Sequence, residues 1–154
     1  MTVDIKEILK SIREVAPMSN LSPKDFADEG GYADILAGFF VEQDMKQHKD
    51  RLKPTQLRKV FHTLKTIERK YKPKGDEEAF IISDVLSLKP ELAYAMGREL
   101  IPIEFYDLMK NSLTAPKLPK VKDFRRLIEF LTALLAYHKY RKGIKTSSEK
   151  GGKE

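Results

Sequence analysis

Helical periodicity is the feature that most constrains the fold of this chain. Apolar residues recur at spacings of three and four in segment after segment, and we find no stretch with the alternation of a half-buried strand. Along residues 120–141 the apolar side chains surround most of the predicted helix instead of following one face. Such a helix needs cover on all sides, so we expect it at the centre of a bundle. The predicted fold class is all-α, a compact bundle of about five to six helices.

Proline, glycine and capping residues delimit the other predicted helices. Ser22 as N-cap and Pro23 in the first helical position mark the start of a short helix. The acidic residues 76–78 are expected to open another helix, because carboxylates are favoured at the positive end of the helix dipole. That helix is expected to break near Pro90. The remaining helices are predicted at residues 1–16, 32–52, 54–72, 91–100 and 103–113.

These helices form one predicted domain, residues 1–141, in which the helix at 1–16 could attach loosely. The Gly-, Ser- and Lys-rich residues 142–154 are expected to be a disordered basic tail. Within the helix at 32–52, the side chains predicted to point inward are Tyr32, Ile35, Leu36, Phe39, Phe40 and Met45. We find neither a membrane-spanning run of about 18 apolar residues nor a signal peptide, and we expect a cytoplasmic protein.

Positive charge is concentrated in two segments. Residues 46–74 carry eleven basic and two acidic residues, and residues 117–145 carry nine basic and two acidic residues. Residues 1–45 and 75–116 each have a net charge of −5, within a total of +6. This alternation is more than solubility requires and favours a polyanionic partner. Nucleic acid fits better than a membrane surface, because no predicted helix pairs an aromatic-rich face with a lysine-rich one.

The helix predicted at residues 54–72 separates its apolar face from a basic stripe. The stripe has spacings of four, three, four and three, and consists of Arg58, His62, Lys65, Arg69 and Lys72. A phosphate backbone would offset the mutual repulsion of these cations. Basic residues at the start of the last helix also oppose the helix dipole, whereas those at its end complement it. Charge therefore predicts the following RNA-binding residues: Lys53, Lys59, Lys65, Arg69, Arg125, Arg126 and Lys139.

The residues that catalysis or metal binding would need are not found in a recognisable pattern. The chain contains no cysteine, and its histidines (His48, His62 and His138) stand apart from one another. Glu77 and Glu78 are adjacent and would point to different faces of a helix, so they do not form an acid–base pair. We expect no enzymatic activity, no catalytic residues, no cofactor and no metal site.

Three stretches carry a resemblance to a known family. Residues 55–61 resemble its Gln-Leu-Arg-Lys helix start, residues 88–98 its Leu-x-Pro-x-Leu-Ala-Tyr-x-x-x-Arg segment, and residues 130–139 its Ala-Tyr-His-Lys helix. In this order, over about residues 32–141, they resemble the small helical subunit of the type III-A CRISPR (Csm) effector complex. The sequence departs from the last motif at Thr132, where the family usually has a glutamate.

The resemblance implies an all-α, non-enzymatic subunit of an antiviral defence complex. Its expected partners are the guide RNA and target RNA, the repeated backbone subunit, the large subunit, and further copies of itself, including a homodimer when isolated. It also implies that Arg58 and Arg98 contact RNA, although Arg98 could instead brace a helix end by an ion pair. Tyr94 and Tyr137 are expected to pack between helices rather than stack on bases.

Two other functions remain open from the residues alone. The chain could be a DNA-binding regulator that places the helix at residues 54–72 in a major groove. It could also be a purely structural adaptor whose cationic faces meet acidic surfaces of other proteins. Binding to phosphates without base contacts would depend on salt and be largely indifferent to sequence.

Overall fold

The computed structural model describes residues 4–47 and 51–152, with side chains as far as residue 144. In these residues it contains helices and loops, with one isolated bridge between Ala79 and Lys120 as the only β-type pairing. This confirms the all-α fold class, with more helices than the five to six expected. The elements are α1 (Ile5–Glu14), η1 (Met18–Asn20, a 3-10 turn), α2 (Pro23–Phe26), α3 (Tyr32–Gln47), α4 (Pro54–Tyr71), α5 (Ser83–Leu86), α6 (Leu88–Gly97), α7 (Ile103–Ser112) and α8 (Val121–Gly152).

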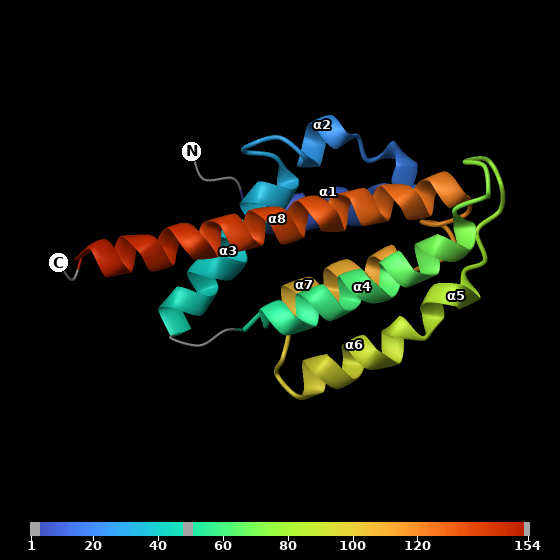
Figure 1. The fold of residues 1–154 in the computed structure, drawn as a ribbon. Coiled ribbons are helices and arrows are strands. Elements are labelled where there is room, and N and C mark those ends of the chain that lie inside the picture. The colour runs from blue at the N-terminus through green and yellow to red at the C-terminus, as the bar shows by residue number, and fades with distance from the viewer. Residues whose placement is uncertain (1–3, 48–50, 153–154) are drawn as a thin grey trace.

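Helix α8 lies at the centre of the bundle, as predicted, and runs along the length of the molecule in Figure 1. It contacts α2, α3, α4 and η1. Its Phe130 ring meets Phe26 edge-on, with the ring centroids 5.5 Å apart. Its Phe124 ring stacks on Phe80 at 4.4 Å. Phe124 and Phe130 are both buried, so α8 packs against other elements on several of its sides.

Polar side chains fix both ends of the buried part of α8. At its start, the buried carboxylate of Asp123 accepts hydrogen bonds from the backbone N–H groups of Ser19 (2.9 Å) and Lys120 (3.0 Å). Further along, Arg141 Nε donates to Asp34 of α3 at 2.7 Å, which lowers the pKa of Asp34. Gly38 allows this contact, because a Cβ there would stand only 3.0 Å from the Arg141 guanidinium.

Helix α1 adds Ile8 and Ile12 to the core and packs against α3 and α7. The ammonium group of Lys117, in the loop before α8, donates a hydrogen bond to the carbonyl of Ile12. Only 4% of Lys117 is exposed, and burial lowers its pKa to about 8. Lys117 is therefore one of the nine basic residues of segment 117–145, but its charge is buried and does not contribute to the basic surface of the protein.

The structure corrects the expected helix at residues 76–78. This stretch is a loop, and α5 begins only at Ser83. The loop pairs with the chain just before α8, since Val121 N–H donates to Glu78 O (2.9 Å) and Phe80 N–H to Pro119 O (3.1 Å). The carboxylates of Asp76 and Glu77 form ion pairs with basic side chains at the start of α8. They do not cap a helix that begins at this loop.

Further differences concern helix ends. Pro90 does not break a helix but lies in the first turn of α6, where its missing N–H costs nothing. Helix α3 ends at Gln47, and residues 48–50 of the predicted helix lie outside the described residues. Met45, expected to point inward, is exposed. Helix α8 is described as far as Gly152, and residues 153–154 lie outside the described part. The disordered tail at residues 142–154 stays a prediction.

Helix α6 ends in a Schellman motif with a glutamate at the position that favours glycine. Leu100 N–H donates to Ala95 O (2.9 Å) and Glu99 N–H to Met96 O (3.1 Å). Glu99 has a φ of 59°, in the left-handed region. Gly97 stands two residues too early to relieve it.

Replacing Glu99 by glycine should therefore stabilise the protein by about 1 kcal/mol. The same substitution at Glu91, inside α6, should destabilise it by about 1 kcal/mol, because glycine is a poor helix former. Urea unfolding of both variants beside the wild type checks this opposite pair of effects. A loss of stability in Glu99→Gly would contradict the assignment of strain to this residue.

Candidate nucleic-acid interface

The exposed face of α4 carries the predicted basic stripe. Its apolar residues Leu57, Val60 and Leu64 are buried in the core, which fixes the rotation of the helix. The basic and histidine side chains that this rotation exposes are Arg58, Lys59, His62, Arg69, Lys70 and Lys72. Lys65 is half-buried and forms an ion pair with Glu68 at 2.7 Å, and Lys70 forms one with Asp84 at 2.9 Å. Arg58, Lys59, Arg69 and Lys72 thus present their charge most directly to solvent.

A groove lies between the start of α4 and the far half of α8. It has a volume of about 570 Å³ and is lined by Pro54, Arg58, Leu135, His138, Lys139, Lys142 and Gly143. We call it the α4–α8 groove. It brings together Arg58 and Lys139, two predicted site residues that are far apart in the sequence. The spacing of residues 135, 138, 139, 142 and 143 along one face of α8 is the sequence signal that could have revealed this groove.

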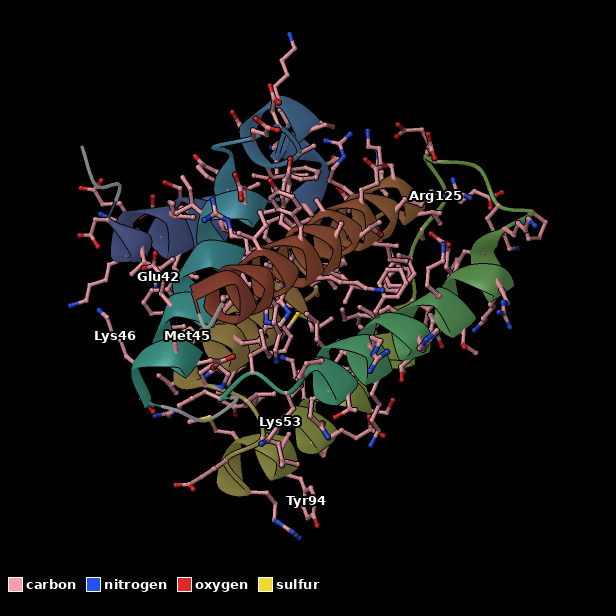
Figure 2. All side chains as sticks on the ribbon, turned by 60° about the vertical axis from the view of Figure 1, so that its left-hand side comes forward. Glu42, Met45, Lys46, Lys53, Tyr94 and Arg125 are labelled. Carbon is pink, nitrogen blue, oxygen red and sulfur yellow. The ribbon has the colours of Figure 1, made fainter. Side chains whose placement is uncertain are left out.

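Lys53 stands directly before α4 and is half-buried, with its backbone N–H donating to Leu100 O at 3.2 Å. This bond joins the start of α4 to the segment between α6 and α7. Figure 2 shows Lys53 between α4 and the end of α6, with Tyr94 beyond it and Arg125 toward the opposite end of the bundle. Lys53 therefore belongs with the groove end of the molecule.

Tyr94 and Arg98 form an exposed pair on α6. The Arg98 guanidinium lies 5.7 Å from the centre of the Tyr94 ring, and its Nη1 donates to the Tyr94 hydroxyl at 3.0 Å. Tyr94 is 64% exposed, so the expectation that it packs between helices is wrong. Tyr137 does pack as expected, since its hydroxyl donates to the carbonyl of Ala27 at 2.7 Å. The i, i+4 spacing of Tyr94 and Arg98 could have indicated their contact.

Cations at the start of α8, and Lys120 just before it, form ion pairs and hydrogen bonds with other residues of the same chain. Glu77 accepts from Lys120 at 2.6 Å and from Lys122 at 2.8 Å. Arg125 pairs with Asp76 and also donates to the carbonyls of Tyr71 (3.1 Å) and Lys74 (2.8 Å).

Arg126 donates to the carbonyls of Ser19 and Leu21. The repulsion between these cations and the dipole of α8 is thus offset by the loop at residues 76–77 and by backbone carbonyls. RNA contact by Arg125 and Arg126 stays a prediction, but both side chains already have structural roles.

Within the described part of the chain, no group of three or more His, Cys, Asp or Glu side chains could hold a metal ion. His62 is exposed and His138 is buried beside the groove, while His48 lies outside the described residues. None of the helices described is long and apolar enough to cross a membrane.

The fold and this surface define a basic helical bundle whose cations flank an apolar groove. The family model described as Csm2 Type III-A matches residues 41–144. The chain belongs to this family and is a small subunit of the type III-A CRISPR (Csm) complex, which confirms the resemblance carried by the three motifs. No curated protein and no solved structure gives a significant match to this chain.

The clamp around Glu77 should make stability sensitive to acid. Hydrogen bonds from Lys120 and Lys122 lower the pKa of Glu77 from 4.5 to about 2. The stabilisation is then complete above pH 4.5 and is lost as the pH falls toward 2, because the unfolded chain takes up the proton first. Thermal unfolding between pH 2 and 6 should show this loss in the wild type and less of it in Glu77→Gln.

The neighbouring Glu78→Gln variant is the matched control, since the Glu78 carboxylate makes no ion pair within the described residues. Glu78→Gln should keep the acid-dependent loss. Equal acid profiles for Glu77→Gln and the wild type would show that the clamp is absent in solution.

Proposed function

We propose that this protein is a non-enzymatic RNA-binding small subunit that contacts the guide RNA–target RNA backbone through the exposed face of α4. The observation that carries the proposal is the exposed row of Arg58, Arg69 and, just after the helix, Lys72, in a chain of the Csm2 Type III-A family. Lys59 is exposed beside this row, on the side of α4 toward α6. Lys139 lines the groove with Arg58, and Lys53 directly precedes Pro54 of the same lining. The proposal also includes Arg98, which contacts Tyr94 on α6.

The geometry of α4 suits a phosphate backbone better than base recognition. From Arg58 to Arg69 the helix rises roughly 16 Å, enough to pass several phosphates. Lysine and arginine side chains on an exposed helix face hold phosphates as mobile point charges or as forks, and they give no sequence readout there. This favours the RNA subunit over the DNA-binding regulator.

Contacts with other subunits have a separate candidate surface. Tyr140, Ile144 and Met45 are 62%, 47% and 37% exposed, and they belong to the neighbouring helices α8 and α3. Figure 2 shows Met45 with Glu42 and Lys46 at the outer side of α3. The proposal assigns this apolar surface to the repeated backbone subunit, the large subunit or another copy of the chain, in the cytoplasm. An adaptor role is then part of the function, alongside RNA binding.

Removing one exposed cation of α4 should weaken RNA binding and its dependence on salt. In Arg69→Gln, affinity for a guide–target duplex should fall roughly three- to tenfold at low salt, and the slope of log affinity against log salt should fall by about one. Fluorescence anisotropy at several salt concentrations measures both quantities, for the isolated chain and for the reconstituted complex.

Lys122→Gln is the matched control, because it removes the same charge from a lysine that is paired with Glu77. It should leave affinity and slope close to those of the wild type. Absence of RNA affinity in the wild type at low salt, both alone and in the complex, would refute the proposed function. Equal losses in the two variants would show that total charge matters and the α4 face does not.

A further inference from the structure

The α4–α8 groove has a chemistry that the basic row alone does not explain. Its floor includes the apolar side chains of Pro54 and Leu135, and Leu135 is half-buried. Cationic side chains line it from both helices, Arg58 from α4 and Lys139 and Lys142 from α8. Acidic side chains are missing from the described residues that line it. A ligand that satisfies this groove has to join an apolar body to negative charge.

The size of the groove narrows the choice of ligand. A volume of about 570 Å³ is in the range of sites that hold small molecules and cofactors. A flat nucleobase with its ribose and flanking phosphates has the required apolar face and negative charge and is in this size range.

Building on the proposed function, we infer that the α4–α8 groove binds one unpaired nucleotide of the RNA. The base lies against Pro54 and Leu135, and the adjoining phosphates lie within reach of Arg58 and Lys139. A paired base cannot enter, because its faces and edges are occupied in the duplex. The groove therefore recognises single-stranded or unstacked positions, whereas the outer row of α4 follows any phosphate backbone.

Gly143 allows the groove to be filled without changing charge. A Cβ at Gly143 would meet no atom within 4 Å, so Gly143→Phe introduces no clash at its Cβ. The substitution also replaces a poor helix former inside α8. Gly143→Phe should weaken binding of single-stranded RNA about tenfold. Binding of a fully paired duplex of the same sequence should change less than about twofold, because its phosphate contacts remain.

Gly75→Phe is the matched control, since Gly75 lies in the loop after α4 and a Cβ there also meets nothing within 4 Å. It should bind both RNAs like the wild type. Anisotropy with the full-length chain and fluorescein-labelled RNAs measures the affinities, and circular dichroism checks that each variant is folded. Photocrosslinking of single-stranded RNA that contains 4-thiouridine should label peptides with Pro54 or Leu135 in the wild type and not in Gly143→Phe.

Unchanged single-strand affinity in a folded Gly143→Phe would overturn the inference while leaving the RNA-binding function in place. Equal weakening for single strand and duplex would overturn it too, because the groove would then have no preference for an unpaired base. Loss of assembly with the other subunits, with RNA affinity unchanged, would assign the groove to a protein segment instead. Absence of any RNA binding by the wild type would refute the proposed function and this inference together.

Discussion

The burial of α8 is the constraint on which the rest of the structure depends. From Leu127 to Leu134 its apolar side chains fill the space between α2, α3 and α4, and in this stretch only Glu129 and Thr132 are exposed. The basic residues of α8 stand on either side of this stretch, at residues 122–126 or from Lys139 onward. The hydrophobic effect thus decides where charge can be displayed, since a buried unpaired ion costs several kcal/mol.

The cations at the start of α8 and those from Lys139 onward have different partners, because different segments lie next to them. At the start of α8, positive side chains face the positive end of the helix dipole, and the acidic loop at residues 76–77 offsets this repulsion. Lys139 and Lys142 are not in a last turn, because α8 continues to Gly152. The dipole therefore does not account for them, and they line the groove opposite Arg58 instead. The proposed function assigns the surface formed by α4 and this part of α8 to a polyanion.

Patterns within single helices could be predicted from the sequence, and contacts between distant segments could not. The bounds of α4 and α7 and the central place of α8 follow from local periodicity and proline positions. The loop at residues 76–78 was mistaken for a helix start, because its carboxylates serve Lys120, Lys122 and Arg125, which are more than forty residues away. Tyr94 was misjudged for a related reason, since the exposure of a tyrosine is decided by neighbours from other helices. The groove was missed because its lining comes from two helices, α4 and α8, that are far apart in the sequence.

The basic row of α4 and the α4–α8 groove would bind RNA by different interactions. The row would bind by electrostatic contacts to phosphates, and the groove by apolar contact with a base. Phosphate contacts release counterions and weaken steeply as salt rises. Contact of a base with an apolar floor depends far less on ionic strength, because it rests on removal of apolar surface from water. A subunit with the row alone would slide along any polyanion, and one with the groove alone would find its nucleotide slowly. In the proposed complex with RNA, the row supplies attraction from a distance, the groove fixes the register in which the strand comes to rest, and Arg58 belongs to both.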